Sequence, residues 1–385
     1  MSTEFGTAET PAFPAARHTR DKRYLFGPIA DFLCLGGSSL LILPLLLLVP
    51  VEPYRAQLAW VMLLMAHFIN HPHFAHSYQL FYRNFRTKAF TNELGSGMRA
   101  RYILSGIVVP LFLLAFFLYC LLSGDAQLLG YGGNIMALFV GWHYVKQGYG
   151  MLMLDAVLKR KFFDERQKKA LLVNSYAVWI AAWLGANDYV ATQHLFELQY
   201  YSFDIPDPLV QIARGTAVAT SLWAAWAIFT HRRARGSLLV NGIMAYVVSL
   251  YAWLLFVRIN PLWLLVVPAL HSLQYLVVVW RFELNYESEQ LGKEDFRANS
   301  LVRRYFGNNF AAHLALFGFA GIVLGFIAFW GLPVALGAVV PYDREIFGGT
   351  LFLFMAWIFI NVHHYFLDNV MWRRENTDTK RFLFS

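Results

Sequence analysis

The stretch RYILSGIVVPLFLLAFFLYCLLS, residues 101–123, decides the class of this fold. After Arg101 no charged residue follows before Asp125, and apolar residues fill the stretch. A helix that spans a bilayer needs about 20 mainly apolar residues, so this segment is long enough to cross. The whole chain of 385 residues is 58% hydrophobic and only 15% charged, which is far from the composition of an average soluble domain. We therefore expect an integral membrane protein with several spans.

Nine further stretches have a similar length and composition. The ten candidate spans are 28–50, 57–81, 101–123, 132–157, 169–186, 209–230, 238–257, 261–281, 310–331 and 348–371. Residues 187–208 and 332–346 contain turn residues and are expected to form loops, with short interfacial helices within them as an alternative. The predicted fold is an all-α polytopic integral membrane protein of about ten transmembrane helices. Its single transmembrane domain covers 28–372, between an N-terminal tail, 1–27, and a C-terminal tail, 373–385.

Lysine and arginine gather in alternate connections of this predicted topology. They precede the first span and follow spans two, four, six, eight and ten, whereas the opposite loops carry mostly acidic residues. Because positive residues accumulate on the cytoplasmic side, both termini are expected to be cytosolic, in the inner membrane if the source is bacterial. This asymmetry and the lipid bilayer's anionic headgroups account for the net charge of +8, so no nucleic-acid partner is required.

Eight histidines lie in the even-numbered spans, which all run from outside to inside. They are His67, His71, His73, His76, His143, His271, His363 and His364. Most fall in the central to cytosolic half of their helices, so one shared site on that side is geometrically feasible. Ionisable residues inside the bilayer are costly, and they are candidates for function by default.

Four of these histidines belong to one segment, MAHFINHPHFAHSY, residues 65–78. His67 and His71 are four residues apart, and His73 and His76 are three apart, so each pair shares a helix face. Pro72 removes a backbone hydrogen bond between the pairs and predicts a kink. Taken alone, His143 or His271 is equally well explained by an interhelical hydrogen bond, and His73 and His76 have the further alternative of a position near the headgroups. Eight such residues, however, exceed what helix packing requires.

The two cysteines, Cys34 and Cys120, cannot form a thiolate cluster, so a bound metal would need nitrogen and oxygen ligands. Imidazole suits iron, copper and zinc. The number of histidines favours two non-haem irons, with copper or zinc as alternatives. Asp368, four residues after His364, is the favoured carboxylate, while Lys146 and Tyr275 are further candidate catalytic residues. Lys146 has a plain alternative interpretation, since its amine can extend to the cytosolic interface.

The histidine set resembles that of the integral-membrane non-haem di-iron enzymes, which include fatty-acid desaturases, hydroxylases and alkane monooxygenases. His67 and His71 match their HxxxH spacing, and His363 with His364 matches the histidine pair of their HxxHH boxes. Ile360 departs from the last box, and ten spans exceed the four to six of that group. A fainter similarity is to membrane carotene-cleaving dioxygenases, which bind one iron through four intramembrane histidines. The resemblance implies an oxygenase that uses O2 to hydroxylate, desaturate or cleave a hydrophobic, membrane-soluble substrate.

Two other classes of function use the same residues. Histidine pairs on facing helices, such as His71 with His143 or His271 with His363, would suit a haem-binding electron-transfer protein. Intramembrane His, Asp and Lys would also suit a proton-coupled transporter. An oxygenase would need a separate electron donor, a ferredoxin or reductase, because the chain has neither a dinucleotide fingerprint nor an iron–sulfur cysteine set. The basic stretch 148–169 is a candidate docking face for that donor.

Overall fold

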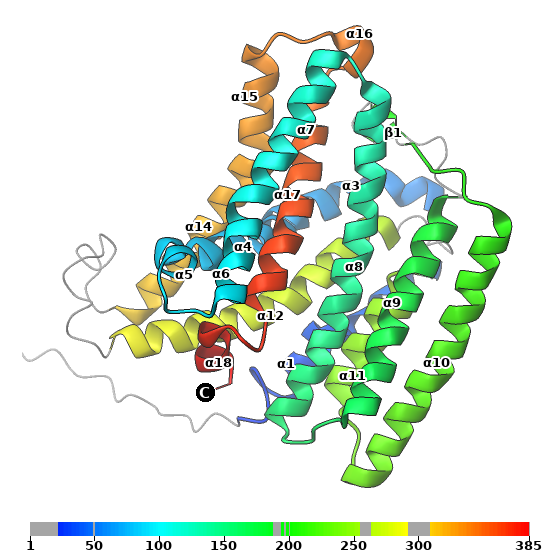
Figure 1. Cartoon of the computed structure of the whole chain (residues 1–385), viewed down its shortest axis with the longest axis vertical. Coiled ribbons are helices and arrows are strands. Elements are labelled where there is room, and N and C mark those ends of the chain that lie inside the picture. The colour runs from blue at the N-terminus through cyan, green and yellow to red at the C-terminus, as the bar shows by residue number, and fades with distance from the viewer. Residues whose placement is uncertain are drawn as a thin grey trace, which may run out of the picture.

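The chain folds as a bundle of helices of very different lengths and inclinations (Figure 1). The computed structural model describes residues 22–48, 51–187, 194–195, 198–199, 201–254, 263–291 and 309–384. Within these ranges the strands are two residues each: β1, His194–Leu195, pairs antiparallel with β2, Leu198–Gln199. The expectation of an all-α fold is therefore confirmed apart from this short hairpin. Most of the predicted tail 1–27 lies outside the described residues.

Several helices are interrupted by π-helical turns, in which backbone hydrogen bonds join residues five apart instead of four. The first half of the chain contains α1 (Pro28–Phe32), η1 (Leu33–Gly37), α2 (Ser38–Leu48), α3 (Val51–Met65), η2 (Ala66–Asn70), α4 (His71–Tyr82), α5 (Phe85–Phe90), α6 (Ser96–Ile103), η3 (Leu104–Val108), α7 (Val109–Ser123), α8 (Ala126–Leu158) and α9 (Glu165–Asn187). The second half contains α10 (Asp207–Arg235), α11 (Val240–Val247), η4 (Val248–Ala252), α12 (Trp263–Leu291), α14 (Phe310–Phe326), η7 (Ile327–Gly331), α15 (Leu332–Val339), α16 (Arg344–Phe347), α17 (Leu351–Met371) and α18 (Thr377–Leu383).

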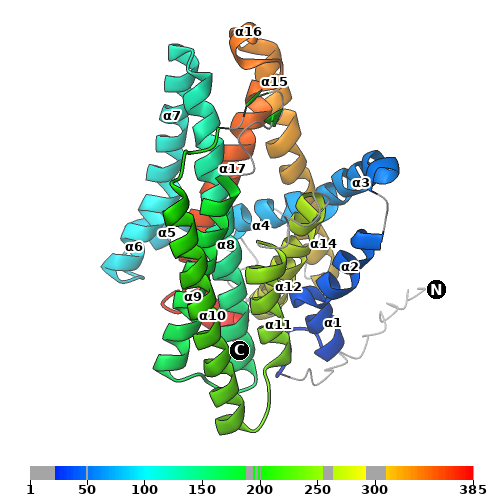
Figure 2. The same cartoon turned by 90° about the vertical axis from the view of Figure 1, so that its right-hand side faces the viewer.

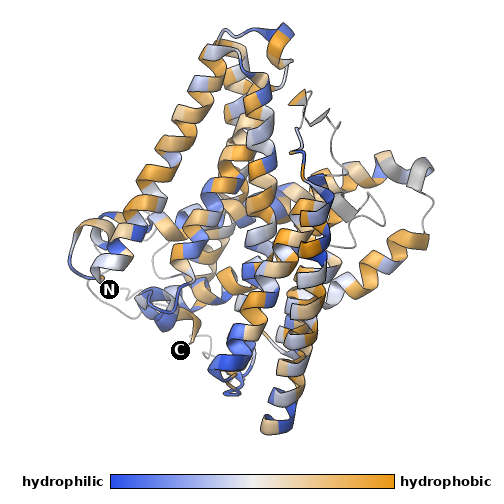
Figure 3. Ribbon diagram, turned by 45° about the vertical axis from the view of Figure 1, so that its right-hand side comes forward, coloured by the Kyte–Doolittle hydropathy of each residue, from blue (hydrophilic) through white to orange (hydrophobic). Residues whose placement is uncertain are grey.

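Six helical segments of the described chain are long and apolar enough to cross a membrane. They are Pro28–Leu48, Ser96–Ser123, Glu165–Asn187, Asp207–Arg235, Phe310–Val339 and Leu351–Met371. Hydrophobic residues dominate the long helices over most of their length (Figure 3). The chain is thus a membrane-embedded helical protein, while the count of ten spans and the cytosolic termini stay predictions.

The loops that differ in predicted sidedness lie at opposite ends of the bundle. In Figure 1 the connections from α8 to α9 and from α10 to α11 are at the bottom, and those from α7 to α8 and from α15 to α17 are at the top. The lower connections carry Lys159, Arg160 and Lys161. These four connections therefore lie at the two ends as the predicted topology requires, with those expected on the cytosolic side at one end and those expected on the opposite side at the other.

The helix formed by α3, η2 and α4 runs across the upright helices instead of along them. It lies roughly level in Figure 1 and again in Figure 2, where the view is turned by 90°. In the turn before Pro72 the chain widens into the π-helical η2, and the His71 N–H donates to Ala66 O. Because Pro72 cannot donate to the preceding turn, the extra residue accommodates the break.

Glycines allow α14 to lie unusually close to α4. A Cβ atom at Gly321 would be 2.4 Å from His76 Cε1, and one at Gly325 would be 2.8 Å from the backbone of His71. Small residues spaced four apart permit such approach between helices in a membrane. The expectation of a loop over residues 332–346 is wrong in part, because the helix that begins with α14 extends into this stretch. Helical structure continues past η7 to Val339, and Pro333, which cannot donate to the preceding turn, follows the π-helical residues of η7 as Pro72 follows those of η2.

Candidate metal centre

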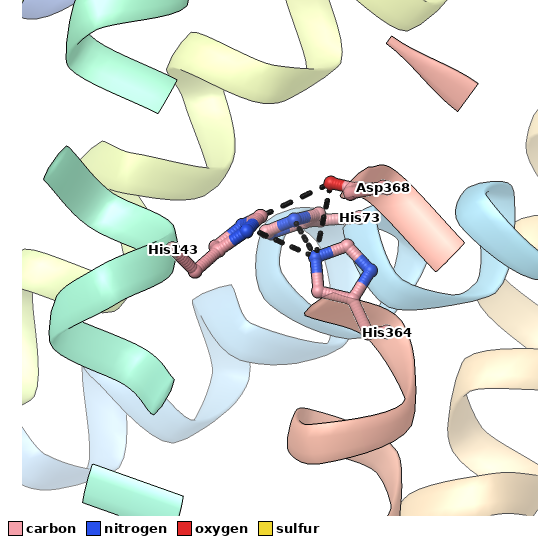
Figure 4. Close-up of side chains that lie close together, drawn as sticks. All are labelled: His73, His143, His364 and Asp368. Carbon is pink, nitrogen blue, oxygen red and sulfur yellow. Dashed lines mark hydrogen bonds and ion pairs between the residues drawn. The ribbon is translucent and has the colours of Figure 1, made fainter. Parts of the chain in front are cut away.

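Four buried side chains from three helices meet in the interior of the bundle. They are His73 on α4, His143 near the middle of α8, and His364 with Asp368 on α17. Each residue offers one ligand atom, and these four atoms all lie within 4.8 Å of one another. Figure 4 shows the three imidazole rings and the carboxylate turned toward a common centre. His364 and Asp368 are four apart on α17, so they share a face of that helix.

The spacing of the ligand atoms is close to that of a metal site. His364 Nε2 lies 2.9 Å from His73 Nε2 and 3.3 Å from His143 Nε2. Asp368 Oδ2 lies 3.4 Å from His364 Nε2 and 3.9 Å from His143 Nε2. Four tetrahedral bonds of about 2.0–2.1 Å to one ion would place neighbouring ligand atoms roughly 3.3 Å apart. Only small shifts of these side chains would therefore be needed to hold one ion.

The electrostatics of the cluster also favour a cation. Asp368 is 6% exposed, and its Oδ2 accepts no hydrogen bond from the described residues. It faces imidazole nitrogens whose lone pairs repel one another unless a proton or a metal ion lies among them. A buried carboxylate is costly without such a partner. A metal ion would satisfy the carboxylate and the three nitrogens together.

Hydrogen bonds fix the orientation of His73. Its Nδ1 lies 2.8 Å from Ser272 Oγ, and that hydroxyl donates to Asn70 Oδ1 at 2.8 Å. The His73 Nδ1–H therefore donates its hydrogen bond to Ser272 Oγ, which leaves Nε2 with a free lone pair toward the cluster. Asn70 is the last residue of η2, so the π-helical turn supports this relay. Such partners hold a ligating imidazole in one tautomer.

Asp368 is positioned by a second set of hydroxyls. The Tyr275 hydroxyl on α12 donates to Asp368 Oδ1 at 2.9 Å and lies 2.6 Å from Ser77 Oγ. Tyr275 also places its ring 4.3 Å from that of His73. The predicted catalytic residue Tyr275 thus contacts two members of the cluster, and it leaves Oδ2 of the carboxylate directed at the nitrogens.

His271, on α12, stands beside the cluster. Its ring centroid is 4.9 Å from that of His143 and 5.1 Å from that of His73. Gln147 Nε2 lies 3.2 Å from its Nδ1 and donates to Gln274 Oε1, while Gln274 donates to Leu35 O in η1. His271 Nε2 has no hydrogen-bond partner among the described residues. The group of four converging ligand atoms does not include His271, so this predicted ligand lies beside the cluster and not within it.

The other predicted ligands lie apart from this cluster. His67 donates from Nδ1 to Leu63 O and packs edge-on against His71, which in turn stacks on Phe329. His76 lies 2.6 Å from Gln79 Oε1 through its Nδ1, and its ring stacks on Phe317. These three histidines, His67 on η2 and the other two on α4, pack against α14 and η7.

His363 points to a different neighbour from His364. Its Nε2 donates to Ser105 O at 2.9 Å, and its Nδ1 accepts from the Tyr78 hydroxyl at 3.0 Å. Ser105 belongs to η3, where the altered backbone pattern makes its carbonyl oxygen available. Lys146 is half-buried on α8 and outside the group of ligand atoms.

Two contributors were absent from the sequence-based site. Ser77 and Ser272 both orient cluster residues, and both were missed because serine is common in membrane helices. A signal was nevertheless present, since Ser77 follows His73 by four residues and Ser272 follows His271 directly.

The fold and the site together define a membrane-embedded helical protein with a buried histidine and aspartate group capable of metal binding. No protein-family model, curated protein or solved structure matches the chain.

Proposed function

We propose that this chain is a membrane metalloenzyme that holds one metal ion with His73, His143, His364 and Asp368. The observation that carries the proposal is the convergence of three imidazole nitrogens and one carboxylate oxygen, which all lie within 4.8 Å of one another. Nitrogen and oxygen ligands of this kind suit iron, copper and zinc. The expectation of two irons stays a prediction, and the five predicted histidines outside this set contact other protein groups.

Iron is the metal that we favour. With His271 next to the cluster, five nitrogen and oxygen donors are at hand, whereas structural zinc sites use four. A redox-active iron would supply oxygen activation for a substrate dissolved in the bilayer. The chain's own residues would orient the ligands, Ser272 through His73 and Tyr275 through Asp368 Oδ1. The burial of the group would exclude water from the reaction.

The substrate that we propose is hydrophobic and enters from the bilayer, because the cluster lies between membrane-embedded helices. Oxidation of such a molecule is proposed over hydrolysis, since hydrolysis needs a supply of water at the site. Haem is less favoured between these histidines, because nitrogens 2.9 Å apart leave no room for a porphyrin between them. A separate electron donor remains part of the proposal.

The test is the metal content of the detergent-purified chain. About one iron per chain, without the absorption band of haem near 400 nm, is expected for wild type. A His143→Ala variant that folds should lose this iron. Oxygen uptake should then appear when iron-loaded protein is mixed with a reductant and the correct lipid, hydrocarbon or carotenoid. Equal iron in wild type and His143→Ala, or no metal after anaerobic preparation, would overturn the assignment.

A further inference from the structure

An apolar groove of about 500 Å³ opens between α2, α10 and the α11–η4 helix. Nine of its ten lining residues have aliphatic or thioether side chains, including Leu40, Ile228 and Val247. The tenth is Tyr251, whose hydroxyl donates to Ser221 and accepts from Asn174, so its polar atom is already bonded. The volume falls within the range of about 300–1,000 Å³ that is typical of small-molecule sites.

The surroundings of the groove determine the chemistry of its occupant. Pro28–Leu48 and Asp207–Arg235 are long and apolar enough to cross a membrane, and Val240–Ala252 is a shorter apolar helix. Figure 2 shows α11 between α10 and the α1–α2 segment. In a bilayer, a groove with such walls is filled by hydrocarbon, since a polar molecule would lose its hydrogen bonds there.

The floor of the groove adjoins the candidate metal centre. Met244, Val248 and Ala252 line the groove and also pack in the core cluster that contains Tyr144 and Trp253. The Tyr144 ring stacks on His271 with 4.1 Å between centroids, and His271 lies beside His143. The groove lining and the Tyr144 ring that stacks on His271 thus belong to one hydrophobic cluster.

We propose that this groove binds the hydrocarbon chain of the substrate and admits it from the bilayer on the His271 side of the cluster. This inference rests on the proposed function, because it assumes that the metal centre acts on a molecule dissolved in the membrane. It narrows the substrate class to a slender chain without charge on the part that enters. The groove offers no cation or hydrogen-bond donor to a polar headgroup, so the headgroup stays outside it.

The experiment uses the full chain in phosphatidylcholine nanodiscs and a palmitic acid probe with a diazirine at its terminal carbon. After irradiation, mass spectrometry locates the adducts. We expect them to concentrate on the α11–η4 peptide and on the α8 peptide that contains Tyr144. Val247→Trp, which fills the groove from a position 41% exposed, should lower these adducts at least fivefold. Val218→Trp is the matched control. Val218 lies on α10 outside the groove and is 63% exposed, so its replacement should leave the adducts unchanged.

Adducts spread evenly over the lipid-facing helices, or insensitive to Val247→Trp, would overturn the groove as a binding site. Iron content is measured on the same samples, so the two proposals fail separately. Groove-selective labelling of a chain that binds no metal would support the hydrocarbon site and overturn the metalloenzyme. Bound iron with even labelling would overturn the groove alone.

Discussion

The Nε2 atoms of His73 on α4 and His364 on α17 lie 2.9 Å apart inside the bundle, although 291 residues separate them in sequence. Each imidazole is carried by a different helix, and the orientation of the His73 ring is also fixed by the hydrogen bond from its Nδ1 to Ser272. Two such atoms can share one proton, but they cannot also satisfy the nearby Asp368 oxygen and His143. One bound cation would satisfy all four of these groups together.

Adjacent histidines on α17 should differ sharply in their effect on metal binding. His364→Ala removes the nitrogen that contacts both His73 and His143, so bound metal should fall below about a tenth of the wild-type amount. His363→Ala removes only the bonds to Ser105 and Tyr78 and should retain the metal. Metal analysis of the two purified variants decides the matter. Loss of metal from both folded variants would support instead the wider ligand set expected from the sequence.

Ser272→Ala should weaken metal binding without unfolding the protein. The substitution deletes the acceptor of His73 Nδ1, so the ring is free to change tautomer and orientation. Loss of such an orienting partner typically costs 10–100-fold in metal affinity. Competition with a chelator of known affinity measures the change. Ser175→Ala is the control, because that hydroxyl bonds to Leu171 O away from the cluster; equal affinities in both variants would contradict the role given to Ser272.

Much of the fold was predictable, because apolar length and charge asymmetry are properties of the chain alone. The stretch around residues 101–123 is helical as expected, and so is the segment that carries His73. The π-helical turns were not predictable, since η1 and η3 present carbonyls to Gln274 and His363 on distant helices. Likewise, the helix continues to Val339 past Pro333 by way of the π-helical residues of η7, and a proline in the sequence does not reveal such a turn.

The types of residue in the site were predictable from the sequence, but which of the eight histidines meet in the cluster was not. Spacing shows which residues share a face of one helix, and it does not show which neighbour covers that face. His73 faces the cluster while His76, three residues later, meets Gly321 of α14. The separation of His363 from His364 was within reach, because successive residues of an α-helix point about 100° apart. Two such side chains seldom serve one compact centre.

Tyr275→Phe should destabilise the protein while leaving its ring in place. The substitution removes the donor to Asp368 Oδ1 and the partner of Ser77, both buried. Leaving a buried polar group unsatisfied costs roughly 1–3 kcal/mol, so the thermal midpoint in detergent should fall. Tyr82→Phe is the matched control, because its hydroxyl bonds to Gly106 O at a partly exposed position. A midpoint for Tyr275→Phe no lower than that of the control would show that the bond to Asp368 contributes little.

Removal of the metal should lower stability in wild type and not in a variant without the site. A ligand that binds only the folded state stabilises it, by about 2.7 kcal/mol when its concentration is 100 times the dissociation constant. Chelation would also return Asp368 to an unpaired state in the interior. Melting curves with and without chelator should therefore differ for wild type and coincide for His143→Ala. Coincident curves for wild type would mean that folding is not coupled to metal.

The close approach of α14 to α4 should depend on Gly321 and not on Gly331. An added Cβ at Gly321 would lie 2.4 Å from His76 Cε1, and the His76 ring cannot retreat because it already stacks on Phe317. Gly321→Ala should therefore cost about 1–3 kcal/mol through overpacking. An added Cβ at Gly331 meets nothing within 4 Å, so Gly331→Ala should be neutral or stabilise the helix by up to about 1 kcal/mol. Thermal midpoints of the two variants test this difference. A Gly321→Ala protein as stable as Gly331→Ala would show that α14 can move away from α4, and the depth of His71 and His76 between these helices would then need another cause.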